Sequence, residues 1–98
     1  MQVTDHVIAL LDRFLKAILQ DPRISPAHIS LYLSILQQYQ LQGRMPVQVY
    51  RDNMAAQAKI SDTTYHRCIN QLAQYGYIRY IPSYDPKKNS TVDICGSV

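Results

Sequence analysis

The first twenty residues carry apolar side chains at helical spacing. The residues that recur every three or four positions are Val7, Leu11, Phe14 and Ile18, and this spacing predicts a helix over residues 4–20. Four further apolar residues widen the stripe to about half of the helix circumference: Ile8, Leu10, Leu15 and Leu19. A stripe this wide can contact two neighbours, so we expect one side to face the core and the other to be available for homodimerisation.

A second helix is predicted over residues 26–41. Pro22 ends the first helix, because the residue before a proline is disfavoured in the α conformation. Ser25 is placed to cap the next helix, and Pro26 suits its first position. The apolar residues of this segment form a broad helical stripe, which predicts the most buried helix of the domain: Ile29, Leu31, Tyr32, Leu33, Ile35, Leu36 and Tyr39.

The rest of the chain alternates between short strands and helices. Residues 46–50 alternate apolar and polar side chains and predict one brief strand. A compact helix is expected over residues 51–58 and a longer one over residues 61–75, with Ser61 as its cap and Gly76 as its stop. Residues 77–82 and 91–95 are two strand-like runs separated by a polar, turn-rich loop. Because an isolated hairpin is marginally stable, we expect residues 47–49 to add a third strand.

The predicted helix over residues 61–75 has two chemically different faces. Tyr65, Ile69 and Leu72 lie on one side of a helical wheel, with Cys68 and Ala73 at its margins. The opposite side carries hydrogen-bonding residues and neither Glu nor Lys: Thr63, His66, Arg67, Asn70 and Gln74. Such side chains reach base edges and phosphates in a major groove, which admits one α-helix. A solvated face without a partner is the alternative.

The order of elements predicts a mainly α fold with a small β-hairpin. The two helices within residues 51–75 have the dimensions of a helix-turn-helix, and the hairpin over residues 77–95 has those of a wing. We therefore predict a winged helix-turn-helix, with a three-helix core, over residues 23–98. Residues 1–22 form an extra N-terminal helix and a possible dimerisation element. Lys87 and Lys88 fall near the hairpin tip, where they are within reach of phosphate, and Lys59 between the two helices is a further candidate phosphate contact.

Composition agrees with this class and excludes several others. The chain has 98 residues and a formal net charge of +3, which is mildly basic and compatible with nucleic acid. No apolar run approaches the roughly 20 residues that cross a bilayer, and the N-terminal residues lack the basic start of a secretory signal. We expect a soluble, cytoplasmic protein without a membrane partner.

Neither catalysis nor a cofactor is predicted. Cys68 and Cys95 are too few and too far apart for a zinc site and are expected as reduced thiols. The three histidines are scattered, and no nucleophile, base or carboxylate pair has recognisable spacing. His28 is expected at the surface. Among the eight tyrosines, Tyr77, Tyr80 and Tyr84 are expected to pack under the hairpin, with base stacking as the alternative.

A family resemblance covers residues 24–94. The residues Ser61-x-x-Thr64-Tyr65-x-Arg67, Leu72 and Gly76-Tyr77-Ile78 resemble the recognition-helix signature of bacterial winged-helix regulators. The stretches HISLYLSILQ and KISDTTYHRCINQLAQYGYIRYIPSYDP are similar to small winged-helix proteins of Bacteroidetes that are often associated with mobile elements and described as transcriptional regulators. The sequence departs from the usual pattern at Tyr50, where a serine or threonine is common, and at Lys59, where a glycine is common.

The resemblance implies a non-enzymatic protein that binds double-stranded DNA and regulates transcription. By position, it gives Thr63, Thr64, His66, Arg67 and Asn70 as DNA contacts in the recognition helix. Lys87 and Lys88 are the corresponding contacts in the wing. Two alternatives remain open at this point. One is a replication or excision accessory factor of a mobile element, and the other is a winged-helix protein-interaction module.

Overall fold

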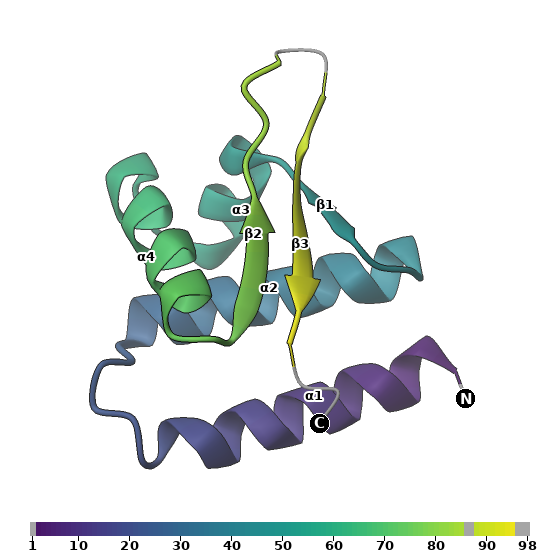
Figure 1. Ribbon diagram of the computed structural model, residues 1–98, viewed down its shortest axis with the longest axis vertical. Helices are drawn as coiled ribbons and strands as arrows, with labels where there is room; N and C mark the ends of the chain where they lie inside the picture. The colour runs from purple at the N-terminus through teal and green to yellow at the C-terminus, as the bar shows by residue number, and fades with distance from the viewer. Residues whose placement is uncertain (1, 86–87, 96–98) are drawn as a thin grey trace.

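The protein consists of four helices and three strands in the residues described by the computed structural model, which are 2–85 and 88–95 (Figure 1). The helices are α1 (Val3–Ile18), α2 (Pro26–Gln42), α3 (Arg51–Ala58) and α4 (Asp62–Gln74). The strands are β1 (Val47–Val49), β2 (Ile78–Ile81) and β3 (Ser90–Ile94). The predicted mainly helical fold with a small β-sheet is confirmed, and each predicted element is present within two residues of its expected ends.

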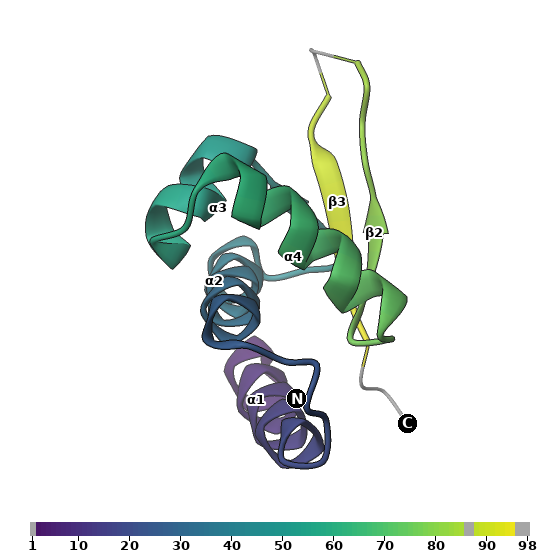
Figure 2. The same ribbon diagram turned by 90° about the vertical axis from the view of Figure 1, so that its left-hand side faces the viewer.

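Helix α2 runs through the centre of the molecule. It buries seven residues, more than any other helix, because its apolar stripe meets neighbours on several sides. It contacts α1, α3, α4 and β1, and α1 lies along it on the side away from α3 and α4 (Figure 2). Leu31 and Ile35 are completely buried at these contacts. The prediction that this helix is the most buried one is confirmed.

Helix α1 divides its apolar stripe between core and solvent. Leu10 and Phe14 are each 2% exposed, and the Phe14 ring stacks on Tyr32 of α2 with the ring centroids 3.7 Å apart. Ile8 and Leu19 are 60% and 80% exposed, so the second side of the stripe has no partner within the described part of the chain. The expected division into two sides is therefore present.

The three strands form one antiparallel sheet with the order β1-β3-β2. Val92 of β3 lies opposite Val47 on one neighbour and opposite Tyr80 on the other. The expected third strand over residues 47–49 is thus confirmed, and it pairs with β3. Val47 and Val92 are completely buried against the helices, while the β2–β3 hairpin continues beyond the helical core (Figure 1).

The turn between α3 and α4 is fixed by backbone geometry and by a cap. Lys59 adopts the left-handed conformation, with φ 62° and ψ 42°, which is uncommon for a residue with a side chain. At this turn the amide of Ile60 donates to the carbonyl of Ala55 at 3.1 Å, a bond typical of helix C-termini. Ser61 then caps α4, because its Oγ accepts a bond from the amide of Thr64 at 3.1 Å.

Two predictions about individual side chains are wrong. His28 was expected at the surface and is 4% exposed, because the N-terminus of α2 is covered by α4. Tyr84 was expected to pack under the hairpin and is 91% exposed, because it belongs to the loop beyond β2, where no helix lies beneath it. Tyr77 and Tyr80 do pack against the core as expected.

A search for membrane-spanning segments gives a negative result. None of the helices in residues 2–85 and 88–95 combines the length and the apolar character that are needed to cross a membrane.

The stacking of Phe14 on Tyr32 predicts that α1 is required for the stability of the core. Replacing Phe14 with Ala should lower the free energy of unfolding by about 3–5 kcal/mol, because a buried aromatic ring is lost and a cavity remains. Urea denaturation measures this change. The neighbouring exposed Arg13→Ala variant serves as a control and should change the free energy of unfolding by less than about 0.5 kcal/mol. Equal losses in the two variants would contradict the assignment of Phe14 to the core.

Candidate nucleic-acid interface

The rotation of α4 about its axis is set by the residues that it buries. Tyr65, Cys68, Ile69 and Leu72 are each at most 1% exposed and face the core. The opposite face therefore meets solvent. The predicted contact residues that are exposed on this face are Thr63, His66, Arg67, Asn70 and Gln74. All five come from one side of a single helix and are brought together as a continuous polar surface.

Some of the predicted contact residues have internal partners. Thr64 is half-buried, and its Oγ1 accepts a bond from Ser61 Oγ at 3.0 Å, so it takes part in the cap of α4. Asn70 Nδ2 donates to the carbonyl of His66 at 2.7 Å, which orients the amide along the helix and leaves its oxygen available. Lys59 is exposed at the end of α3, beside the start of α4.

The acidic residue in the first turn of α4 is drawn toward an arginine. Asp62 Oδ2 lies 3.8 Å from Arg51 Nε, and the same Nε donates to Asp52 Oδ1 at 3.1 Å. Both carboxylates contribute to a raised pKa of Arg51, and the hydrogen bond that Arg51 donates to Asp52 is the main cause. Asp62 therefore shares a cation with Asp52 rather than standing alone beside the polar face of α4.

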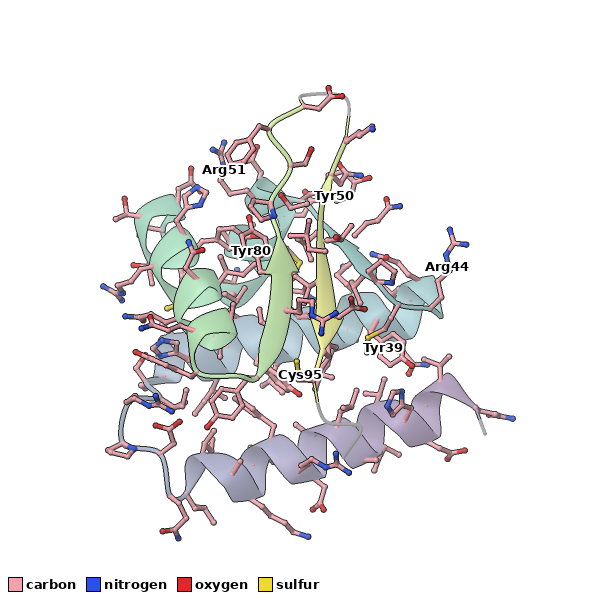
Figure 3. The ribbon with its side chains drawn as sticks, in the orientation of Figure 1. Tyr39, Arg44, Tyr50, Arg51, Tyr80 and Cys95 are labelled. Atoms are coloured by element: carbon pink, nitrogen blue, oxygen red, sulfur yellow. The ribbon has the colours of Figure 1, made fainter. Side chains whose placement is uncertain are left out.

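A groove of about 400 Å³ separates α4 from the β2–β3 hairpin. His66 and Asn70 line it from α4, and Tyr80 lines it from β2. Figure 3 shows Tyr80 between α4 and β2, with Arg51 further along toward the hairpin loop. Burial raises the pKa of Tyr65, which also lines the groove, so its hydroxyl stays protonated at neutral pH. The groove walls are thus rich in hydrogen-bonding groups.

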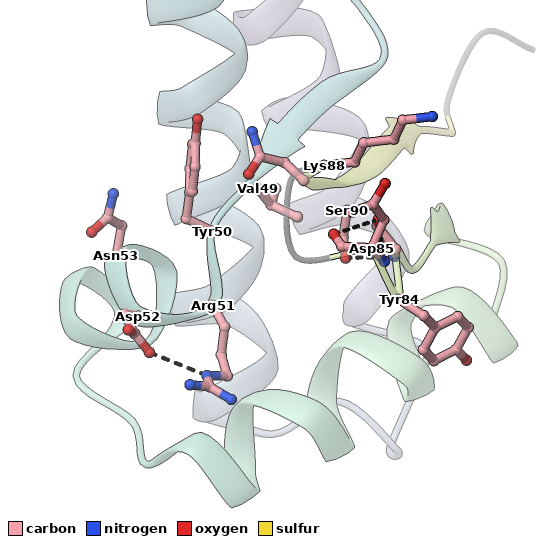
Figure 4. A pocket seen from close by; sticks show the side chains of 11 residues that line it. Val49, Tyr50, Arg51, Asp52, Asn53, Tyr84, Asp85, Lys88 and Ser90 are labelled. Carbon is pink, nitrogen blue, oxygen red and sulfur yellow. Dashed lines mark hydrogen bonds and ion pairs between the residues drawn. The ribbon is translucent and has the colours of Figure 1, made fainter.

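A second hollow of about 510 Å³ adjoins the groove near the hairpin loop (Figure 4). Arg51 and Tyr84 line both hollows, so the groove and the hollow share a wall. Lys88 is exposed and lines the second hollow together with Asp52 and Asp85. The predicted contact Lys87 lies outside the described residues.

Arg51, Tyr80 and Tyr84 line the groove but are not among the predicted DNA contacts, since base stacking by the two tyrosines was only the alternative to packing under the hairpin. Only Tyr50 separates Arg51 from β1, and β1 pairs with β3 of the hairpin. The predicted third strand was therefore a signal that Arg51 and the hairpin would be neighbours. The signal for the exposure of Tyr84 was its place in the polar, turn-rich loop predicted between residues 82 and 91.

A hydrogen-bond network fastens the far end of α4 to the connection between α1 and α2. The amide of Ser25 donates to Nδ1 of the buried His28 at 2.9 Å, which makes Nδ1 an acceptor and places the ring proton on Nε2. Nε2 then donates to Gln71 Oε1 of α4 at 2.7 Å. Through these two hydrogen bonds, His28 connects the start of α2 to the last turn of α4.

Asp21 makes a second connection between the same segments. Its carboxylate accepts two side-chain bonds from Arg23, at 2.8 and 2.9 Å, and one from the Tyr77 hydroxyl at 2.7 Å. These hydrogen bonds, with those of Arg23 the largest cause, hold the pKa of Asp21 well below its usual range. Arg23 also lies over the ring of Tyr75, 4.0 Å from its centroid.

Metal ligation and disulfide formation have little structural basis in residues 2–85 and 88–95. Within these ranges, no group of three or more His, Cys, Asp or Glu side chains is arranged to hold a metal ion. Cys68 is a buried free thiol, and Cys95 is an exposed one.

Comparisons of the chain with protein-family models, curated proteins and solved structures gave no match. Functional inference therefore depends on the geometry of the polar face of α4, the groove and the hairpin.

The hydrogen bonds of Asp21 predict that the folded protein becomes less stable in acid. Because the pKa of Asp21 is lower in the folded protein than in the unfolded chain, its contribution is complete above about pH 5 and is lost as the pH falls below about 4. Asp21→Asn should lower the melting temperature by a few degrees at pH 7 and flatten its decline toward pH 3. Thermal unfolding from pH 3 to pH 7 measures both effects.

Asp12→Asn is the matched control, because Asp12 is 63% exposed and pairs with Lys16 at the surface. Its melting temperature should stay close to that of the unmodified protein. An Asp21→Asn curve that runs parallel to the original curve at every pH would contradict this role.

Proposed function

We propose that the protein is a non-enzymatic, double-stranded DNA-binding transcriptional regulator of the winged helix-turn-helix class. In this proposal α4 enters the major groove, and the β2–β3 hairpin acts as the wing on the adjacent phosphate backbone. The observation that carries the proposal is the exposed face of α4, on which Thr63, His66, Arg67, Asn70 and Gln74 present hydrogen-bonding groups. An α-helix fits a major groove, and these side-chain types are those that contact base edges there.

Three basic side chains on or near this face favour contact with a polyanion such as DNA. Arg67 lies on the face itself, Lys59 lies beside its start, and Lys88 lies in the hairpin. Arg67 and Lys59 form no ion pair with a described residue. Asp62 is drawn toward Arg51, so the one carboxylate in the first turn of α4 has a nearby cation. We assign base contacts to the α4 face and phosphate contacts to Lys59 and the hairpin.

The N-terminal helix provides a basis for a homodimer within the same proposal. Ile8, Leu15 and Leu19 lie on the outer side of α1 and are 60%, 45% and 80% exposed. Helix α1 has an acidic first turn at Asp5 and a basic last turn at Lys16. An antiparallel pair of α1 helices therefore places acid against base along the apolar stripe. Two-fold symmetry would give two copies of α4 and a repeated DNA half-site.

The apolar surface of the proposed dimer continues onto α2. Gln40 Nε2 donates to Thr4 Oγ1 at 2.9 Å, which marks one edge of the antiparallel α1–α2 contact. Leu11 lies seven residues after Thr4, and Leu33 lies seven residues before Gln40. Because seven residues are about two turns, these two leucines lie on the same edge of the helix pair. Leu33 is 44% exposed. A partner α1 can therefore contact both helices.

The DNA proposal predicts a sequence preference that depends on Arg67. A selection from random duplexes should enrich one motif, and Arg67→Ala should weaken binding to it by about 10-fold to 100-fold. Lys88→Ala should reduce the dependence of log K on log salt by about one unit, because one phosphate contact is lost. Titration by fluorescence anisotropy at several salt concentrations measures both effects.

Arg44→Ala is the matched control, since it removes one exposed positive charge beyond the end of α2, on the side of the molecule away from α4 (Figure 3). It should bind the selected duplex nearly as tightly as the unmodified protein. The proposal fails if no duplex is enriched, or if Arg67→Ala binds as well as this control. The second result would favour a protein-interaction module. Binding that favours a mobile-element origin or end over promoters would instead indicate a replication or excision factor.

The homodimer predicts a mass of twice the chain in solution. Leu15→Asn should shift the protein toward monomer, because it places an amide in the middle of the apolar stripe of α1. Sedimentation equilibrium at micromolar concentrations measures the mass. Leu41→Asn is the control, since Leu41 is also an exposed leucine, at 67%, but lies near the end of α2 outside the stripe. A monomeric unmodified protein would rule out this interface.

A further inference from the structure

A cleft of about 280 Å³ lies between α1 and the turn that follows α4. It is separate from the groove beside the hairpin, since the two hollows share no lining residue. Leu10, Phe14 and Ala17 of α1 form one apolar wall, and Tyr77 contributes an aromatic ring from the opposite side. The Tyr77 ring meets Phe14 edge to face, with the centroids 5.3 Å apart. The cleft volume lies just below the range of pockets for drug-sized ligands, so it suits a smaller molecule.

The hydroxyl of Tyr32 faces this cleft without a hydrogen-bond partner among the described residues. Tyr32 is 2% exposed and lines the cleft, and no described residue forms a hydrogen bond with its hydroxyl. Every fully enclosed side-chain nitrogen or oxygen in the described residues does have a partner, so the Tyr32 hydroxyl reaches the open space of the cleft. By contrast, the buried Tyr39 places its hydroxyl 2.6 Å from His6 Nδ1. Because it faces this space and has no partner among the described residues, the Tyr32 hydroxyl is free to donate a hydrogen bond to a ligand in the cleft.

Arg13, a second polar residue of the cleft, also favours a ligand that accepts hydrogen bonds. Arg13 lines the cleft, is exposed, and forms no ion pair with a described residue. Burial raises the pKa of Tyr32, so its hydroxyl remains a donor at neutral pH. Cys95 lines the same cleft with an exposed thiol, and Figure 3 shows it between the end of β3 and α1. The cleft thus combines apolar walls with a cation and a hydroxyl donor, and none of the described residues that line it carries a carboxylate.

We infer that this cleft binds a small apolar carboxylic acid. Its carboxylate pairs with Arg13 and accepts a bond from Tyr32, and its hydrocarbon part packs against Leu10, Phe14 and the ring of Tyr77. A planar guanidinium and a hydroxyl are matched to two carboxylate oxygens. A neutral molecule of the same shape would leave the positive charge without a partner. The inference does not depend on DNA binding, because the cleft shares no residue with the α4 face or with the groove beside it.

The test is a titration of the full chain, without DNA, monitored by amide chemical shifts. Hexanoate and benzoate are the probes, and 1-hexanol and benzamide are their neutral counterparts. The acids should cause saturable shifts at Gly76, Tyr77 and Cys95, and the neutral molecules should bind at least about 10-fold more weakly. Arg13→Gln should weaken acid binding by about 10-fold and leave the neutral molecules unaffected. Lys16→Gln, which removes the same charge from a neighbouring turn of α1, should bind the acids as before.

Two further measurements separate the role of the hydroxyl from a purely structural role. Tyr32→Phe should weaken acid binding several-fold without lowering the melting temperature, because the hydroxyl has no protein partner to lose. The acids should also slow alkylation of Cys95 by iodoacetamide, with the buried Cys68 as an internal reference. The inference is overturned if neither acid gives saturable shifts at tens of millimolar. It is also overturned if Arg13→Gln and Tyr32→Phe bind the acids as tightly as the unmodified chain.

Discussion

Burial of one side of α4 is the constraint on which the proposed interface depends. Tyr65, Cys68, Ile69 and Leu72 are almost completely enclosed, so the helix cannot rotate without exposing apolar surface that is worth about 1.5–3 kcal/mol per large side chain. This fixes the direction of every polar residue on the other side. The same packing places α4 against α2 and β2, and thereby sets the width of the groove beside the hairpin. The packing of the core therefore determines which residues of α4 form its polar face.

The helices and strands could be predicted from the sequence because their signals are local. Apolar periodicity, Ser61 as a cap and Gly76 as a stop all act within a few residues, and so does the division of α4 into two faces. The side-chain environments that were missed depend on distant segments. His28 is buried because α4 covers it, and the acceptor of its hydrogen bond in α4, Gln71, lies 43 residues away in the sequence. Tyr84 is exposed because the loop beyond β2 extends past the helices, and the polar residues of that loop show that it leaves the sheet but not how far it lies from the helices.

The two ends of α4 have different surroundings. Its first half borders the groove and the hairpin, where Arg51 lies near Asp62. Its second half is fastened through Gln71 to His28, and the turn beyond it through Tyr77 to Asp21. A helix of 13 residues is about 20 Å long, and its regular backbone fixes the direction of one end relative to the other. The connection between α1 and α2 therefore restrains the orientation of the polar face from its far end. Arg23 over Tyr75 adds a third contact to this restraint.

The strand order β1-β3-β2 has a consequence for the order in which the protein forms during synthesis. β3 is the central strand, yet it is made after both of its neighbours. Until residues 90–94 emerge, β1 and β2 have no strand with which to pair, because they do not contact each other in the sheet. All four helices precede β3 in the chain, so they can associate before it emerges. At that stage the nascent chain is a helical unit with two unpaired strands, and residues 90–94 complete its sheet.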